Sequence, residues 1–196
     1  MVEHSAIDAT VISMSHADRP DPETIILNNG EPAATVEHVL EKLTELDLEH
    51  QTITHPPLYT VEQSKQVEFV QPGAHTKNLF LRNKKGRMFL LTVEPDHQVD
   101  LRALRDRLQR PGGQFAFAST ERLGKFLGVV PGAVSPLALI NDHECKVEFF
   151  IEASLLTQEW IYFHPCRNTH STRLRTVDFQ RVIELWKHPV TALSFD

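Results

Sequence analysis

The sequence is poor in cysteine and contains neither a long apolar run nor a recognisable targeting signal. Its 196 residues include only two cysteines, Cys145 and Cys166, too few for a disulfide framework or a four-thiolate zinc site. No apolar run approaches the roughly 20 residues that a membrane helix needs. The N-terminal segment is acidic and polar, unlike a secretory signal. These absences predict reduced thiols, no membrane contact and a cytoplasmic location.

Positive charge is also in short supply. Lys and Arg number 20 against 26 Asp and Glu, giving a formal net charge of −6. A protein that coats nucleic acid without selectivity is normally basic, so any nucleic-acid contact must be local. The hydrophobic share of 41% is ordinary for a globular chain. Residues 1–30 lack periodicity and are expected to form a flexible or loosely packed extension, and residues 31–196 a single domain.

Common signatures of nucleotide and hydrolase sites are absent. The sequence has no GxGxxG, no GxxxxGK[ST] and no GxSxG. Neither cysteine has a catalytic signature around it. The 11 histidines, among them His50, His55, His143, His164 and His170, are scattered and do not show zinc-ligand spacing. We therefore expect no metal and no cofactor, and keep a metal-dependent hydrolase that uses these histidines as an alternative.

Apolar periodicity and capping residues predict alternating helices and strands. Helices are expected over 36–46, after Thr60, after Asp100, after Ser119 and from about 176–178 onward. Strands are expected near 51–54, 79–82, 87–93, 115–117, 137–140, 146–151, 160–163 and 190–195, with a hairpin turn at 83–86. Because there is no regular βαβ alternation, the predicted fold is α+β, with one mixed, mostly antiparallel sheet flanked by helices.

Three local features point to a site, and each also has an ordinary structural explanation. Lys77 opens an apolar strand, where its ammonium needs an anionic partner or must reach the solvent. The loop 127–136, with two prolines and two glycines, either presents backbone groups to a small ligand or only connects two elements. His164, at a strand end, is either an acid–base group or a partner for a backbone group.

Three stretches containing these features occur together in a known family. They are GAHTKNLFLRNKKGRMFLLTV at 73–93, FASTERLGKFLGVVPGAVSPLALIND at 117–142, and FHPCRNTHSTRL at 163–174. In them the chain resembles the YbaK/ProX-type aminoacyl-tRNA editing proteins, most closely the free-standing prolyl-tRNA editing group. The resemblance runs from about residue 31 to the C-terminus. It implies a mixed sheet of barrel-like curvature surrounded by helices.

The resemblance also implies a function, the trans-editing of tRNA-Pro mischarged with alanine. Such a protein is a deacylase, a carboxylic ester hydrolase that acts on the aminoacyl-tRNA ester. Cysteine or serine as the edited amino acid, and a non-catalytic binding module, remain alternatives. Implied partners are the tRNA acceptor end and, transiently, prolyl-tRNA synthetase.

The same resemblance assigns roles to individual residues. The expected catalytic residues are Lys77, which anchors the substrate end, His164, which lines the pocket, and Gly132. The expected substrate-binding residues are Asn78, Ala133, Val134, Ser135 and Pro136. Gly132 is expected to leave space for the aminoacyl group, because a Cβ there would occupy it.

The proposed chemistry is consistent with the motifs that are missing. An aminoacyl ester is already activated, so water placed at the carbonyl and stabilisation of the developing charge suffice without a protein nucleophile. Small residues between the prolines of the loop favour alanine over larger amino acids.

Local positive charge is the expected means of binding tRNA. Arg82, Lys84 and Lys85 lie in or next to the hairpin turn and are expected beside the pocket, where they would contact the acceptor end. A second group, Arg102, Arg105, Arg107 and Arg110, is either a further contact or ordinary surface charge.

Overall fold

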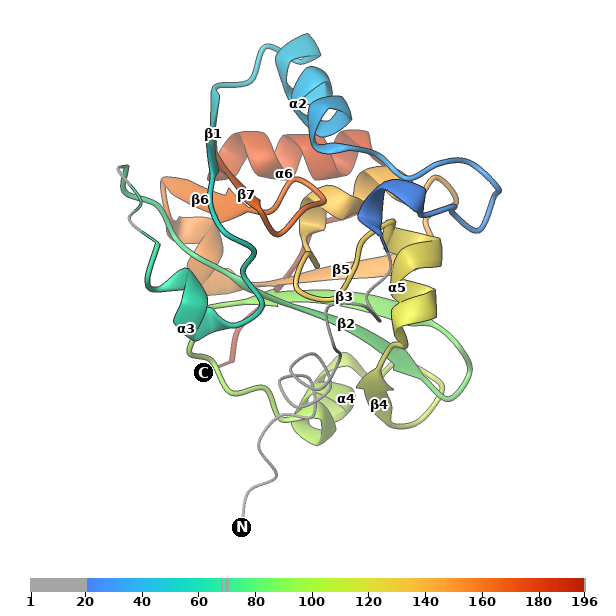
Figure 1. Ribbon diagram of the computed structural model, residues 1–196. Helices are drawn as coiled ribbons and strands as arrows, with labels where there is room; N and C mark the ends of the chain where they lie inside the picture. The colour runs from blue at the N-terminus through green and yellow to red at the C-terminus, as the bar shows by residue number, and fades with distance from the viewer. Residues whose placement is uncertain (1–20, 68, 70, 196) are drawn as a thin grey trace.

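The computed structural model describes residues 21–67, 69 and 71–195, and it contains most of the predicted elements (Figure 1). The α-helices are α2 (Val36–Glu45), α3 (Val61–Ser64), α4 (Leu101–Leu108), α5 (Thr120–Leu127) and α6 (Thr176–Leu185). The strands are β1 (His50–Thr54), β2 (Lys77–Asn83), β3 (Met88–Val93), β4 (Phe115–Phe117), β5 (Val147–Glu152), β6 (Trp160–Phe163), β7 (His170–Arg175) and β8 (Thr191–Leu193). Short 3-10 helices are η2 (Pro22–Thr24), η3 (Pro136–Asn141) and η4 (Ala153–Thr157).

Side-chain caps fix the starts of three helices where the sequence predicts them. Thr60 and Gln63 form a complete capping box at α3. Asp100 accepts hydrogen bonds from first-turn amides of α4, and Ser119 does the same at α5. Gly128, in the left-handed conformation, ends α5. Each cap satisfies backbone groups that would otherwise lack partners, at a gain of about 1 kcal/mol.

A five-stranded sheet in the order β4-β2-β3-β5-β8 forms the centre of the molecule. The predicted hairpin of β2 and β3 is antiparallel, and β4 pairs antiparallel with the other edge of β2. Strands β5 and β8 add in parallel on the β3 side. The sheet is therefore mixed, as the sequence predicts.

A second sheet of three antiparallel strands, β1-β7-β6, lies beside the first. Ala74, three residues before β2, pairs with Ile161 of β6, so the chain leaves one sheet and enters the other between residues 74 and 77. The α+β class and the mostly antiparallel pairing are confirmed. The expected barrel-like curvature appears as two adjoining sheets, which form no closed barrel within the described residues.

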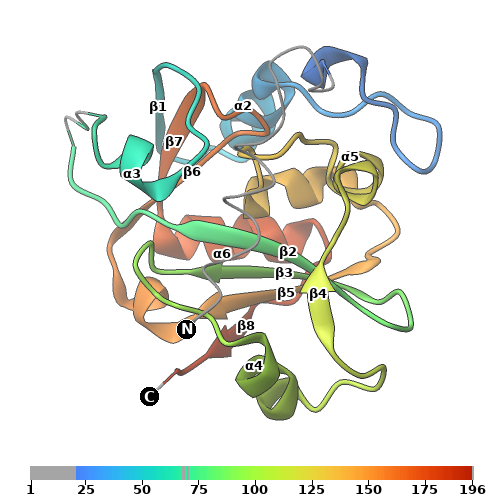
Figure 2. The same ribbon diagram turned by 60° about the horizontal axis from the view of Figure 1, so that its bottom comes forward.

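The two faces of the five-stranded sheet pack against different elements. Figures 1 and 2 show α4 on one side, and α5, α6 and the three-stranded sheet on the other. Along β2, Leu79 and Leu81 point into the smaller core beside α4, whereas Phe80 points into the larger core. Because side chains alternate along a strand, Lys77 shares the α4 face and Asn78 the opposite face.

Two parts of the chain differ from the sequence prediction. Residues 137–140, predicted as a strand, belong to the 3-10 helix η3. Ser135 caps this helix and Pro136 occupies its first turn, and a continuous apolar run buried on all sides does not distinguish a helix from a strand. Strand β7 was not predicted, because its residues His-Ser-Thr-Arg-Leu-Arg are mostly polar.

Residues 21–30 contact the domain, and residues 1–20 lie outside the described part of the chain. The amide of Asn28 donates to the carbonyl of Lys125 on α5, and Arg167 donates to the carbonyl of Pro22. Ile25 and Ile26 line a cavity of about 350 Å³ against α5. The sequence predicts a flexible or loosely packed extension over residues 1–30. Residues 21–30 make the contacts above, and the rest of the predicted extension is not described by the structure. No helix in the described ranges has the length and apolar character to cross a membrane.

Candidate active site

Three chain segments meet where β6 ends and β7 begins. The amides of His55 and Leu58 donate to the carbonyls of Thr169 and Asn168, at 2.9 and 3.0 Å. The Asn168 side-chain amide returns a hydrogen bond of 2.9 Å to the Leu58 carbonyl. The loop that contains Gly132 packs against the same residues. This junction brings two of the predicted catalytic residues, Gly132 and His164, into one region.

Gly132 is fixed by packing within the protein. Its φ is +91°, which favours glycine. A Cβ would lie 2.9 Å from the Tyr59 ring, 3.0 Å from the Leu58 carbonyl oxygen and 3.2 Å from the Asn168 amide nitrogen. The expectation that a Cβ would fill ligand space is wrong for this conformation, because protein atoms already occupy that position.

The remaining residues of the loop divide into two groups. The side chains of Ala133, Ser135 and Pro136 are buried, and the Ser135 hydroxyl accepts a hydrogen bond from the Leu137 amide at 3.2 Å. These three side chains therefore serve the fold. The Ala133 amide and the Ser135 carbonyl are also paired within the protein, with the Val130 carbonyl and the Ala138 amide. Val134 is partly exposed, and part of its side chain packs against the larger core.

His164 is held as a neutral imidazole. Its Nδ1 lies 2.7 Å from the His170 carbonyl oxygen, which can only accept, so Nδ1 carries the proton. Burial lowers its pKa to about 4, and the nearby histidines add to this effect. At neutral pH, Nε2 therefore has a lone pair that can accept a hydrogen bond.

Other histidines lie near His164. The sequence analysis did not predict this grouping. The ring of His55 lies 6.0 Å from that of His164. His75 stacks on Tyr162 of β6 at 5.0 Å, and burial lowers the pKa of His75; burial also lowers the pKa of His170. His55 and His75 come from parts of the sequence far from His164, and none of these histidines shows zinc-ligand spacing. Within the described ranges, no group of three or more His, Cys, Asp or Glu is arranged to hold a metal ion.

His55 and Ser171 form a hydrogen-bonded pair that resembles a base and a nucleophile. The His55 Nε2 lies 2.9 Å from the Ser171 Oγ, and both residues are buried. The His55 Nδ1 donates to the Pro56 carbonyl at 2.9 Å, whereas a catalytic triad has a carboxylate at this position. Burial of both groups favours a structural bond between the segments that build the junction.

Lys77 and Asn78 occupy opposite faces of β2. The Lys77 ammonium donates to the carbonyl of His97, on the α4 side of the sheet. The Asn78 side-chain oxygen Oδ1 accepts a hydrogen bond from the Thr92 hydroxyl at 2.7 Å on the other side. The structure therefore does not bring the Lys77 ammonium to His164, although the family resemblance expects both in one pocket. Strand alternation is the physical reason.

The predicted tRNA contacts lie at the far end of β2 from Lys77. Strand β2 runs from Lys77 to Asn83, so at about 3.3 Å per residue roughly 20 Å separates Lys77 from the hairpin turn. Arg82, Lys84 and Lys85 therefore do not lie beside Lys77, although the sequence analysis expects all of them near one pocket. Of the second basic group, Arg105 pairs with Asp106 and Arg110 with Glu148.

The two cysteines are in different surroundings. Cys166 is fully buried, and burial raises the pKa of its thiol to about 12. Its Sγ lies 3.9 Å from the Asn141 amide nitrogen. Cys145 is exposed. A thiol with so high a pKa is a poor nucleophile at neutral pH.

The family follows from comparison with known proteins. The aminoacyl-tRNA editing domain model matches residues 55–182. This chain therefore belongs to the aminoacyl-tRNA editing domain family, and the resemblance noted from the motifs is confirmed.

Individual relatives are similar over most of their length. The prolyl-tRNA editing protein ProX of Acetoanaerobium sticklandii is 33% identical over 147 residues, which cover 74% of this chain and 88% of ProX. The prolyl-tRNA synthetase associated domain-containing protein 1 of Danio rerio is 35% identical over 158 residues, 80% of this chain and 85% of that protein. A solved structure described as a candidate trans-editing enzyme for prolyl-tRNA synthetase covers 82% of this chain and 97% of its own, with a TM-score of 0.60 and 16% identity, and shows the shared fold.

Proposed function

We propose that this protein is a trans-editing deacylase that hydrolyses the aminoacyl ester of mischarged tRNA-Pro, with alanine as the edited amino acid. The observation that carries the proposal is the 33% identity with ProX, a prolyl-tRNA editing protein, over 88% of the length of ProX. We also propose a transient contact with prolyl-tRNA synthetase and action in the cytoplasm, where tRNA is charged.

In the proposed reaction, water attacks the ester directly. The water oxygen bonds to the carbonyl carbon, the bond to the ribose oxygen breaks, and that oxygen leaves with a proton. The Nε2 of neutral His164 accepts a hydrogen bond from the attacking water and so positions it. With a pKa near 4, His164 is too weak a base to remove a proton fully before the attack.

Lys77 and the loop complete the proposed site. Lys77 is the proposed cationic anchor of the substrate end, a role in which its ammonium exchanges the His97 carbonyl for the substrate. The backbone of the loop from Gly132 to Pro136 and the side chain of Val134 surround the aminoacyl group. Asn78, on the same face of β2 as Phe80, stays a proposed substrate contact.

A deacylation panel tests the function. Purified protein is incubated with tRNA-Pro charged with Ala, Cys, Ser or Pro, and with Ala on tRNA-Ala. We expect the fastest hydrolysis for Ala on tRNA-Pro and none for Pro. A His164→Asn variant is expected to lose activity, whereas His143→Asn, which changes an exposed histidine, keeps it.

Three outcomes would point to another function. Tight tRNA binding without any hydrolysis would indicate a binding module. Loss of activity with a chelator would indicate a metal-dependent hydrolase. Faster release of Cys or Ser than of Ala from tRNA-Pro would keep the reaction and change its substrate.

A further inference from the structure

One threonine hydroxyl lies within an otherwise apolar strand. Strand β3 has the sequence Met-Phe-Leu-Leu-Thr-Val, all six residues are buried, and Thr92 is fully excluded from solvent. A valine would fill nearly the same volume without a polar group, whereas a buried hydroxyl costs stability unless it is hydrogen-bonded. The Thr92 hydroxyl donates at 2.7 Å to the side-chain oxygen of Asn78, which lies directly opposite on β2. The hydroxyl therefore serves the Asn78 side chain rather than the packing of the strand.

A second threonine holds the other end of the same amide. The Asn78 Nδ2 donates to the Thr76 hydroxyl oxygen at 3.4 Å, and the Thr76 hydroxyl donates to the backbone carbonyl of Tyr162 at 3.3 Å. Because a carbonyl oxygen can only accept, the Thr76 hydroxyl uses its one proton on Tyr162 and faces Asn78 with a lone pair. The Asn78 nitrogen must then face Thr76, and the oxygen must face Thr92. These three bonds fix one orientation of the Asn78 amide.

The fixed amide keeps one N–H that has no hydrogen-bond partner among the described residues. A side-chain amide has two N–H donors, and Thr76 takes only one of them. Asn78 is partly exposed, unlike Thr92, so solvent and ligands can reach it. A donor that is held in place before a ligand binds suits an oxygen that gains negative charge during a reaction.

The segment before Asn78 is attached to the strand that leads to the candidate active site. The backbone of Ala74 forms two hydrogen bonds with β6, at 2.8 and 2.9 Å. Two residues further on, the Thr76 hydroxyl adds the bond to the Tyr162 carbonyl. His164 follows Tyr162 by two residues, just beyond the end of β6. The hydrogen bonds that orient Asn78 therefore connect it to the strand that positions His164.

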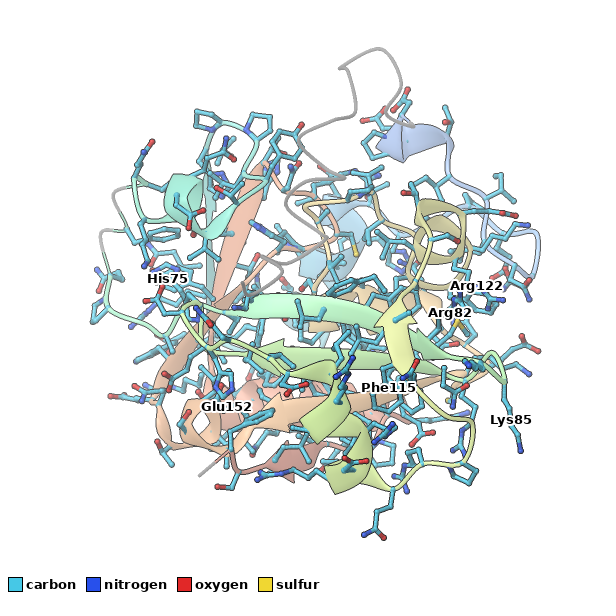
Figure 3. The ribbon with its side chains drawn as sticks, turned by 90° about the horizontal axis from the view of Figure 1, so that it is seen from below. His75, Arg82, Lys85, Phe115, Arg122 and Glu152 are labelled. Atoms are coloured by element: carbon cyan, nitrogen blue, oxygen red, sulfur yellow. The ribbon has the colours of Figure 1, made fainter. Side chains whose placement is uncertain are left out.

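The two adjacent polar residues at the start of β2 differ in this respect. The Lys77 ammonium lies on the α4 side of the sheet. Asn78 lies on the face that it shares with Phe80, which packs into the larger core. Figure 3 shows His75, three residues before Asn78, at the end of the five-stranded sheet where β2 begins. Of the two side chains, that of Asn78 is the one linked to β6.

We propose that Thr92 and Thr76 are positioning residues for the editing reaction. Their hydroxyls hold the Asn78 amide so that its second N–H donates a hydrogen bond to the carbonyl oxygen of the aminoacyl ester, where negative charge develops as water attacks. The amide keeps its proton throughout. His164 positions the water, and Asn78 stabilises the oxygen. This inference rests on the proposed function and gives Asn78 a specific task within it.

The first test measures kcat and KM of threonine variants on alanyl-tRNA-Pro. Thr92→Val removes the hydroxyl and keeps the shape, whereas Thr92→Ser keeps the hydroxyl. Thr76→Val removes the other hydroxyl at a partly exposed position, outside the core. Thr52→Val is the matched control, because the Thr52 hydroxyl forms a bond of 2.8 Å with Thr172 between two strands of the other sheet. Melting curves verify that the variants are folded.

We expect Thr92→Val and Thr76→Val to lower kcat about tenfold and to change KM little, because a donor to developing charge acts mainly in the transition state. Thr92→Ser should recover most of the loss, and Thr52→Val should change neither constant. Normal kcat in both valine variants, or a change in KM alone, would overturn the positioning role. A Thr92→Ser enzyme as slow as Thr92→Val would also overturn it.

A second test asks whether the threonines act through Asn78. Asn78→Ala should lower kcat about 100-fold, the usual cost of losing one such donor. In the Asn78→Ala background, Thr92→Val should cause no further loss. Asn78→Asp, whose ionised carboxylate can only accept, should be as inactive as Asn78→Ala. A further loss from Thr92→Val in that background, or an active Asn78→Asp, would overturn the proposal.

Failure of the proposed function would appear differently. If the wild-type protein hydrolyses none of the charged tRNAs, the deacylase assignment fails, and NMR still measures the orientation of the amide. The side-chain N–H signals of Asn78, assigned by their loss in Asn78→Ala, should shift in Thr92→Val and Thr76→Val and stay in place in Thr52→Val. Unchanged signals in both Thr92→Val and Thr76→Val would overturn the positioning by the two threonines.

Discussion

The Nδ1 of His164 donates a hydrogen bond to the backbone carbonyl of His170, at 2.7 Å. This contact fixes the tautomer and the orientation of the ring at the junction of β6 and β7. Because the ring is largely enclosed by protein, protonation of Nε2 would place a charge where only limited water can solvate it. The pKa of His164 is accordingly lowered from 6.5 to about 4.

The first prediction concerns the stability of the protein in acid. Between pH 6.5 and about 4, the unfolded chain binds a proton at His164 that the folded protein does not. The free energy of unfolding is therefore fully retained above pH 6.5 and falls as the pH drops, by up to about 3 kcal/mol from this residue. Urea unfolding at several pH values measures the effect.

The matched comparison is the variant His164→Gln. His75 and His170 also have lowered pKa values, so the wild-type protein loses stability from several groups at once. We expect the decline between pH 7 and pH 4 to be smaller in the variant by the contribution of His164. Parallel curves for the two proteins would show that His164 titrates normally.

Local sequence signals account for much of the fold. Asp100, Ser119 and Thr60 begin helices through hydrogen bonds to nearby amides, which depend on residues only a few positions away. The hairpin of β2 and β3 likewise follows from two apolar runs around a short turn that contains Gly86. Such elements are predictable because their determinants are close in sequence.

Strand β7 could not be predicted because its polar side chains are buried by distant partners. The guanidinium of Arg173 lies 3.7 Å from the Trp160 ring centre, and its Nε donates to the Pro72 carbonyl at 2.8 Å. Thr172 bonds to Thr52 across the strands at 2.8 Å. No alternation of polar and apolar residues signals a strand stabilised in this way.

The candidate site was only partly predictable for the same reason. His164 and Gly132 stand in motifs, but the contacts of His55 with Ser171 join residues more than 100 positions apart. The face on which the Lys77 ammonium lies depends on the register of β2, which the motif alone does not give.

The second prediction concerns Gly132 and the stability of the loop. Gly132→Ala places a Cβ 3.0 Å from the Leu58 carbonyl oxygen in a left-handed backbone conformation. We expect a loss of about 1–3 kcal/mol in the free energy of unfolding, measured by urea titration. Gly86→Ala is the control, since φ is +80° there but no atom lies within 4 Å of the Cβ, and it should cost less. Equal losses would assign the whole effect to backbone strain.

The third prediction is that Lys77→Ala lowers kcat/KM for alanyl-tRNA-Pro by about 100-fold or more, because it removes the proposed substrate anchor. The lost hydrogen bond to the His97 carbonyl should cost only about 1 kcal/mol of stability. Lys65→Ala, which breaks an exposed salt bridge with Asp96, should change neither quantity. A Lys77→Ala enzyme with near-normal kinetics would remove Lys77 from the site.

The fourth prediction is that no side chain forms a covalent intermediate. Ser171→Ala and the double variant Cys145→Ser, Cys166→Ser should keep kcat within a fewfold, since water attacks the ester directly. Their melting temperatures should fall, because Ser171 and Cys166 are buried. Rapid-quench experiments should show no burst of released tRNA. A burst that disappears in Ser171→Ala would establish an acyl-enzyme on that serine.

The last prediction concerns selection by the size of the amino acid. Val134 is a partly exposed residue of the loop, and its neighbours Ala133 and Ser135 are buried. Shortening it in Val134→Ala should enlarge the pocket and weaken rejection of larger aminoacyl groups by about 1–3 kcal/mol. The measurement is the ratio of deacylation rates for Ala and a larger amino acid on the same tRNA, beside a melting curve. Val177→Ala, at a position 69% exposed on α6, controls for loss of a valine elsewhere. If both variants keep the wild-type ratio, Val134 does not line the pocket, and selectivity must depend on residues around His164.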